Sequence, residues 1–121
     1  MEKCNSVKVY LATPYSHADK VVRIQRVAQV DAKAAELMEG GYIVFSPISH
    51  SHPISEYCGV DSQDHDFWLR QDLWILVLCD ELHILCLEGW AESKGIKAEI
   101  IKAEEYGMKI VHHYYIRGRR I

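Results

Sequence analysis

"HILCLEGWAESKGIKAEI" (residues 83–100) contains an apolar run, a turn of small and polar residues, and the start of a helix, in that order. His83 to Leu87 have the length and character of a buried strand, and Lys94 to Tyr106 have the composition of a helix. A buried strand followed directly by a helix is the repeating unit of an α/β fold. We therefore expect the rest of the chain to repeat it.

The remaining sequence does repeat this alternation. "VKVYLAT", "YIVFS" and "MKIVHHY" are rich in β-branched and aromatic residues, which indicates strands, and two segments between them have apolar residues at spacings of three and four, which indicates helices. The predicted strands are 7–13, 42–46 and 108–114, and the predicted helices are 18–38 and 66–79. Residues 47–64 are polar and broken by Pro and Gly, so we expect a long irregular loop that is functional or mobile.

Strands that alternate with helices predict right-handed crossovers and a parallel sheet. The expected fold is a flavodoxin/Rossmann-like doubly wound α/β domain with four to five strands in three α/β/α layers, formed by residues 1–121 as one domain. Such sheets bind ligands at the carboxyl ends of their strands. The loops 13–17, 46–53 and 88–95 should meet there.

Composition and charge exclude several classes of protein. The net charge is −3, which gives no electrostatic reason to expect a nucleic acid polymer or an anionic membrane as partner. The most apolar stretch, 73–87, is interrupted by Asp80 and Glu81, so it should not span a membrane. The basic tail "RGRR" (117–120) is interpreted as a solvated end.

The cysteines predict a reducing compartment. Cys4, Cys58, Cys79 and Cys86 form no CxxC motif and no secretory leader precedes them. Reduced thiols in the cytoplasm are therefore expected.

The glycines do not form the usual phosphate-binding loops. The chain has neither a GxGxxG motif after the first strand nor a GxxxxGK[ST] motif, which disfavours a dinucleotide or P-loop site. However, Ser93 suits an N-cap, Gly95 lets backbone approach a ligand, and the free amides of the following helical turn favour an anion. A phosphate or a carboxylate would fit there.

Two carboxylates occupy unusual positions. Glu99 borders the apolar stripe of its helix near the N-terminus, where the dipole favours the ionised form, so it is either a nucleophile or a residue that complements the dipole. Asp72 lies on the apolar face of its helix, between Trp68 and Ile75, and burial there would raise its pKa. It is either a proton donor or a rim residue bound by a backbone amide or an Arg.

The loops add hydroxyl groups and histidines. Tyr15 and Ser16 should face the same edge of the sheet, where Tyr15 either orients a carboxylate or packs. His50 and His52, with His17 and Cys58 nearby, lack the spacing of a zinc site, so we expect no metal and interpret the two histidines as substrate contacts or solvated residues.

The order of "YLATPYSH", "WLRQDLWIL", "CDELHIL" and "GWAESKGIKAEI" resembles the nucleoside 2-deoxyribosyltransferase-like superfamily, and most closely a small branch of uncharacterised bacterial and phage proteins (DUF1937-like). The resemblance implies that Glu99 attacks the anomeric carbon of a nucleoside or nucleotide, that Asp72 helps the base to depart, and that Tyr15 orients Glu99. It implies no cofactor. Two carboxyl groups in different environments also suit glycosidic cleavage with retention.

The resemblance extends to the substrate. Base-exchanging members of the superfamily commonly have an acid six residues before the nucleophile. Hydrolases of nucleoside 5′-monophosphates instead have Ser followed by Gly, and Ser93 with the nearby Gly95 resembles that pattern. We therefore favour a nucleotide over a free nucleoside as substrate. Trp90 is predicted to contact substrate, and Arg26 is expected either to reach the phosphate or to be solvated. Base-recognition contacts cannot be transferred, because the "SHSHP" loop is particular to the uncharacterised branch.

The resemblance also implies assembly, because superfamily members often complete their sites across subunits. We expect a homodimer or larger homo-oligomer, with Tyr114, Tyr115 or the "SHSHP" loop as candidates for the crossing contact. The predicted function is an N-glycosidase or deoxyribosyltransferase. The alternatives are a nucleotide-binding sensor or accessory protein without turnover, and a structural α/β protein with a vestigial pocket.

Overall fold

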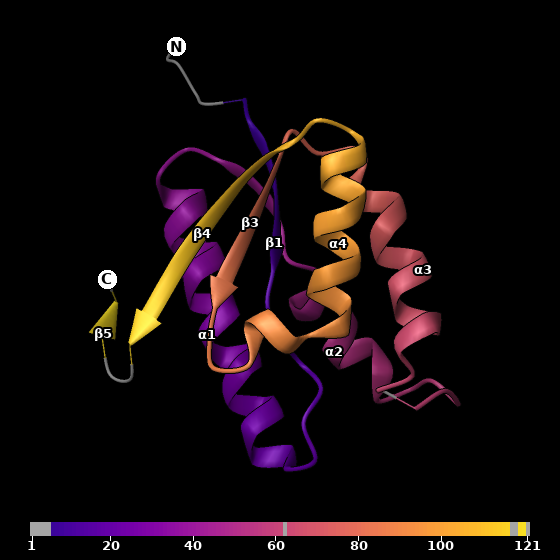
Figure 1. The fold of residues 1–121 in the computed structure, drawn as a ribbon. Coiled ribbons are helices and arrows are strands. Elements are labelled where there is room, and N and C mark those ends of the chain that lie inside the picture. Colours follow the sequence, from indigo (N-terminus) through magenta and orange to yellow (C-terminus); the bar gives the residue numbers. More distant parts are fainter. Residues whose placement is uncertain (1–5, 62, 117–118, 121) are drawn as a thin grey trace.

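The computed structural model describes residues 6–61, 63–116 and 119–120, with the backbone alone at 115–116 and 119–120. It contains a twisted sheet of five described strands in the order β2-β1-β3-β4-β5, in which β1 to β4 are parallel and β5 runs antiparallel to β4 (Figure 1). The strand bounds are β1 Lys8–Ala12, β2 Ile43–Phe45, β3 Glu81–Cys86, β4 Lys109–Ile116 and β5 Arg119–Arg120. The predicted α/β architecture is confirmed.

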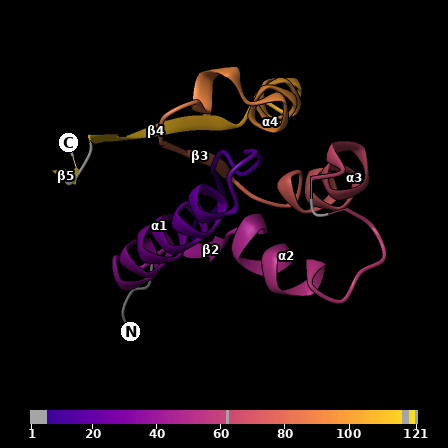
Figure 2. The same ribbon diagram turned by 90° about the horizontal axis from the view of Figure 1, so that it is seen from below.

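Helices cover both faces of this sheet. Figure 2 shows α1 and α4 on opposite sides of the strands, which gives the three α/β/α layers. The helix bounds are α1 Lys20–Glu39, α2 Pro47–Ser55, α3 His65–Leu76 and α4 Lys94–Glu105, and a single 3₁₀ turn, η1, covers Trp90–Glu92.

The first strand shows how the core is divided. Val9 and Leu11 pack against the apolar face of α1, whereas Tyr10 and Ala12 point to the other face, toward α3 and α4. Alternate side chains of a strand point to opposite faces, and a central parallel strand is buried on both. Tyr10 is therefore a hydroxyl-bearing side chain enclosed between the sheet and two helices.

The prediction of an irregular loop over residues 47–64 is wrong for the first half of that segment, because α2 begins directly after β2. The Ser46 hydroxyl accepts a hydrogen bond from the Ser49 amide at 3.4 Å and caps the helix, and Pro47 occupies the first turn, where a missing N–H costs nothing. Pro53 lies in the last turn of the helix, two residues before its end at Ser55. Ser followed by Pro is a helix-start signal, which the high content of polar residues and Pro obscured.

The strand order places a crevice between β1 and β3. The chain leaves β1 toward α1 on one face and leaves β3 toward α4 on the other, so the two loops diverge at the carboxyl ends of these strands. Such a switch point is where open α/β sheets bind ligands.

None of the described helices is both long enough and apolar enough to cross a bilayer. Cys58, Cys79 and Cys86 are free thiols, whereas Cys4 and Arg117 lie outside the described residues.

Candidate active site

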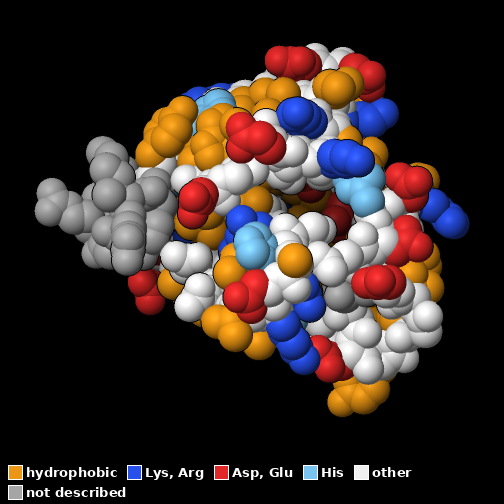
Figure 3. Space-filling view, turned by 60° about the horizontal axis from the view of Figure 1, so that its bottom comes forward, with side chains coloured by type: hydrophobic (Ala, Val, Ile, Leu, Met, Phe, Trp, Pro, Cys, Tyr) orange, Lys and Arg blue, Asp and Glu red, His pale blue; other side chains and the backbone are white. Residues whose placement is uncertain are grey.

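A pocket opens at the carboxyl ends of β1 and β3. Its empty space is about 740 Å³ when the part open to solvent is counted. Its walls come from the loop after β1, from α2, from α3 with the residues before it, and from the start of α4. Figure 3 shows the hollow, with acidic surface visible inside it and histidine at its rim.

Glu99 lies at the inner end of this pocket, in the second turn of α4, and is 6% exposed. Tyr10 donates a hydrogen bond from its hydroxyl to Glu99 Oε2 at 2.5 Å. Burial raises the pKa of Glu99 to about 8, the Tyr10 hydrogen bond lowers it, and the nearby Asp72 raises it. The expectation of an ionised Glu99 at neutral pH is therefore wrong, because the loss of solvation outweighs the hydrogen bond and the helix dipole.

The hydrogen bond to Glu99 was predicted for Tyr15, and the structure corrects this. Tyr15 lines the pocket, but its hydroxyl is bonded to Nδ1 of His52 at 3.0 Å. Tyr10, fully buried, makes the contact instead, and burial next to Glu99 raises the pKa of its phenol. One sequence signal was available: a buried Tyr hydroxyl needs a partner, and Tyr10 lies within an otherwise apolar strand.

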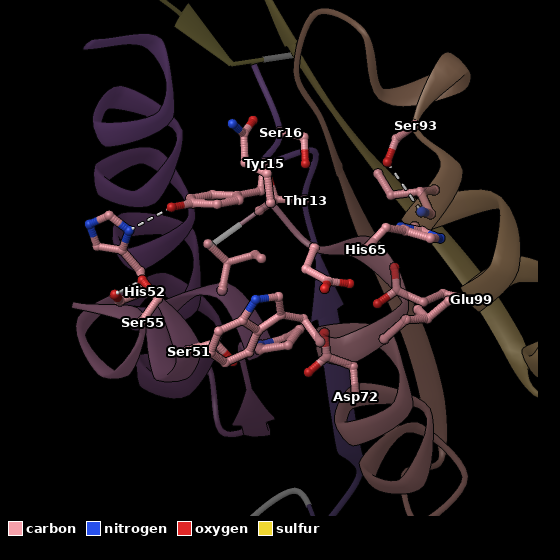
Figure 4. A pocket seen from close by; sticks show the side chains of 18 residues that line it. Thr13, Tyr15, Ser16, Ser51, His52, Ser55, His65, Asp72, Ser93 and Glu99 are labelled. Atoms are coloured by element: carbon pink, nitrogen blue, oxygen red, sulfur yellow. Dashed lines mark hydrogen bonds between the residues drawn. The ribbon is translucent and has the colours of Figure 1, made fainter. Parts of the chain in front are cut away.

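Asp72 faces the same pocket from the middle of α3. Burial raises its pKa to about 6, in the direction expected from the sequence. The alternative of a rim aspartate held by an amide or an Arg is not observed, since the carboxyl group of Asp72 makes no hydrogen bond or ion pair with any described residue. In Figure 4 the side chains of Asp72 and Glu99 approach the pocket from α3 and α4.

The start of α4 forms a polar corner. The Ser93 hydroxyl accepts a hydrogen bond from the Ile96 amide at 3.2 Å, so Ser93 is the N-cap, and both Ser93 and Gly95 line the pocket. A Cβ at Gly95 would lie 3.8 Å from Cε1 of His65 and 3.9 Å from Oγ of Ser93. These are ordinary contacts, so nothing in the described protein requires glycine there, and its small size leaves room for a ligand.

The opposite wall comes mainly from α2 and the loop after β1. His52, predicted as a substrate contact, lines the pocket beside Tyr15, and Ser16 is also in the lining. Sequence reasoning missed Ser51 and Ser55, because their positions depend on α2 being a helix.

Sequence reasoning also missed other lining residues, among them His65, Trp68 and Thr13. His65 is the first residue of α3, Trp68 lies one turn later, and Thr13 follows β1 directly. The expected position of loop 13–17 gave a signal for Thr13, whereas only tertiary contacts place His65 and Trp68 here.

Two predicted ligand contacts lie elsewhere. Arg26 does not line the pocket: its guanidinium donates to the carbonyl oxygen of Ser16 at 3.0 Å and to that of Glu88 at 2.9 Å. Burial lowers its pKa. Trp90 packs edge-on against His112, with ring centroids 5.2 Å apart, and does not line the pocket either. Arg26 joins the loops after β1 and β3, and Trp90 covers the sheet near β4.

The histidines do not converge on a metal site. Nδ1 of His17 accepts a hydrogen bond from the Asp19 amide, and His50 is exposed beside Phe45. Within 6–61, 63–116 and 119–120 no three His, Cys, Asp or Glu side chains are grouped so that they could hold a metal ion.

The comparisons confirm the resemblance at two levels, the family and the fold. The chain is similar to the solved structure of a 2-deoxyribosyltransferase from the psychrotolerant bacterium Bacillus psychrosaccharolyticus, with a TM-score of 0.59 and 19% identity over 89% of this chain and 72% of that chain. The chain belongs to the family described as domain of unknown function DUF1937, whose model matches residues 7–115. No match is found among curated proteins.

Proposed function

We propose that the protein cleaves the N-glycosidic bond of a small nucleotide or nucleoside through a glycosyl ester on Glu99, either as an N-glycosidase or as a deoxyribosyltransferase. The observation that carries this proposal is the pairing of two carboxyl groups in one pocket. Glu99 and Asp72 both have raised pKa values and interact electrostatically, and Tyr10 holds Glu99 in place. Retaining glycosidic cleavage requires such a pair.

In the first step a Glu99 oxygen bonds to C1′ of the sugar while the bond from C1′ to the base nitrogen breaks. The electron pair of that bond goes to the base, and Asp72 supplies the proton that makes the base a neutral leaving group. In the second step Asp72 takes a proton from water, or from an incoming base, as that nucleophile bonds to C1′ and releases Glu99. Two displacements at C1′ retain its configuration.

The protonation states limit the pH range of this reaction. With pKa values of about 8 for Glu99 and about 6 for Asp72, the pair holds one proton between these values. In the free protein that proton resides mainly on Glu99. Attack requires it on Asp72, so only a minority of molecules are in the reactive form.

We expect a bell-shaped dependence of kcat/KM on pH, with limbs near 6 and 8. Below the lower limb both carboxyl groups are protonated and Glu99 cannot attack. Above the upper limb no proton remains for the base. Initial rates of base release between pH 5 and pH 9 test this, and a rate that is constant across the range would contradict it.

The corner at the start of α4 supports a monophosphate as part of the substrate. A cap hydroxyl and free amides of a first helical turn accept an anion. Ser93→Asp keeps the N-cap but adds negative charge, so the affinity for a nucleoside 5′-monophosphate should fall roughly tenfold or more relative to that for the free nucleoside.

Titration calorimetry with both ligands measures this ratio. Ser93→Asn is the matched control, because it caps the helix without charge. An unchanged ratio in Ser93→Asp would show that the phosphate binds elsewhere or that the substrate has none.

The function itself is tested by incubating the protein with ribo- and deoxyribonucleoside monophosphates and their nucleosides. Chromatography detects free base, and intact-mass analysis detects a sugar adduct that maps to Glu99. Free base together with this adduct is the expected result. A structural protein with a vestigial pocket would give neither product nor any thermal shift.

A nucleotide-binding sensor or accessory protein is the alternative, and one observation favours it. The high pKa of Glu99 keeps its carboxyl group mostly neutral at pH 7, which suits hydrogen bonding to a ligand better than attack on it. Ligand binding without base release from any nucleotide would support this alternative.

We also propose that the chain acts in the cytoplasm as a homodimer or larger homo-oligomer. Trp74 and Leu78 are 72% and 61% exposed on and after α3, and Ile101 and Tyr106 are 58% and 60% exposed on and after α4. These large apolar surfaces suit a contact between copies. Tyr114 is half-exposed, whereas the Tyr115 side chain lies outside the described residues. Sedimentation at the mass of a single 14.0 kDa chain would contradict assembly.

A further inference from the structure

Thr13 has a buried hydroxyl without a partner at the edge of the pocket. It follows β1 directly, is 6% exposed, and belongs to the pocket lining. Its Oγ1 makes no hydrogen bond with the described part of the chain, and it alone among the buried side-chain N and O atoms described has none. In the view of Figure 4, Thr13 lies between Tyr15 and Asp72.

An unpartnered hydroxyl is unfavourable in a folded protein. A buried polar group without a hydrogen bond retains its full desolvation cost. Val has the same shape as Thr and would avoid that cost. The hydroxyl of Thr13 therefore gains no stabilising hydrogen bond from the described part of the chain, which leaves it available to a ligand in the pocket that it lines.

The chemistry around Thr13 indicates the class of group it would bind. The α4 corner offers backbone amides for an anion, and Glu99 marks where the anomeric carbon must lie under the proposed function. A threonine hydroxyl is neutral and both donates and accepts. It therefore matches another hydroxyl, and the hydroxyls of a nucleotide nearest to the anomeric carbon are those of its sugar.

We propose that Thr13 is a specificity residue whose hydroxyl forms a hydrogen bond with a sugar hydroxyl of the bound nucleotide. This proposal rests on the proposed function. Because Oγ1 is enclosed, this hydrogen bond requires Thr13 to turn to another staggered χ1 position. Thr has more than one accessible χ1 position, so the turn is readily made.

The test compares the Glu99→Gln variant, which is the parent here, with Thr13→Val and Thr13→Ser made in that parent, in titration calorimetry. The probes are the 5′-monophosphates of adenosine, guanosine, cytidine and uridine, each in its ribo, 2′-deoxy and 3′-deoxy form, in a Glu99→Gln background that keeps them intact. Thr13→Val should bind roughly five- to tenfold more weakly than the parent to forms that carry the contacted hydroxyl, and equally well to the form that lacks it. Thr13→Ser should retain the affinity of the parent.

Thermal unfolding separates this role from a structural one. Because the hydroxyl has no partner to lose, Thr13→Val should be at least as stable as the parent. A clear loss of stability in Thr13→Val would overturn the proposal, since it would reveal an internal partner or a structural water. Thr13→Ala is a second variant that should show the same dependence on ligand form.

The remaining outcomes separate the two proposals. Suppose that the parent binds nucleotides and that Thr13→Val either binds every form as tightly as the parent does or loses the same affinity for every form. The proposed role of Thr13 is then wrong, while the proposed function stands. If the parent and the wild type bind none of the probes, the proposed function fails and the role of Thr13 fails with it.

Discussion

Glu99→Gln is expected to lower the rate of base release by roughly a thousandfold or more, while nucleotide binding is largely retained. The amide has nearly the shape of the carboxyl group and accepts the Tyr10 hydrogen bond, but it cannot form a stable ester with C1′. The pocket should therefore stay intact while the chemistry stops. Steady-state rates and titration calorimetry with the same nucleotide measure the two effects separately.

Glu104→Gln provides the matched control for that experiment. Glu104 lies on the exposed side of α4, five residues after Glu99, and its substitution should leave the rate unchanged. Base release by Glu99→Gln at the wild-type rate would exclude Glu99 as the nucleophile. Absence of release from both Glu99→Gln and wild type, with binding intact, would favour the nucleotide-binding alternative.

The same substitution is expected to stabilise the folded protein at alkaline pH. The pKa of Glu99 rises from 4.5 to about 8 on folding, so the folded state retains a proton that the unfolded state loses. The stability is fully present below pH 4.5 and is lost as the pH rises toward 8. At pH 9 Glu99→Gln should exceed wild type in free energy of unfolding by on the order of 2–4 kcal/mol, and the difference should shrink toward pH 5.

Urea unfolding at pH 5, 7 and 9 measures this difference. A smaller slope of the same sign should persist in Glu99→Gln, because burial also raises the pKa of Asp72. Glu104→Gln again serves as control and should follow wild type at each pH. A constant difference between Glu99→Gln and wild type from pH 5 to pH 9 would show that Glu99 is better solvated than its 6% exposure indicates.

Much of the fold could be predicted from the sequence, since the alternation of elements is local and strong. β1 and β3 are continuous apolar runs, and α1 has a regular apolar stripe. The helix α2 could not be predicted from polarity and proline content, because its Ser46 cap and Pro47 start compete with the general rule that such segments are loops.

The site could be predicted in its residue types but not in its contacts. Glu99, Asp72, Ser93 and His52 do line one pocket. The Tyr that holds Glu99 was misassigned, because only the alternation of side chains along β1 decides that Tyr10 faces α4.

The protonation of Glu99 was also misjudged. Position near a helix start favours an ionised carboxylate, but how far burial opposes it depends on which residues cover the side chain. That covering comes from the sheet and from α3, and local sequence does not reveal it.

The contacts of Arg26 separate the residues near the pocket that fix its width from those that can vary. Arg26 holds the loops after β1 and β3 through hydrogen bonds to the backbone oxygens of Ser16 and Glu88, and the charge of Glu88 also acts on its guanidinium. The side chain at position 16 lines the pocket but takes no part in the hydrogen bond from Arg26. Substitutions at position 16 can therefore change ligand preference while Arg26 keeps the two loops at the same separation.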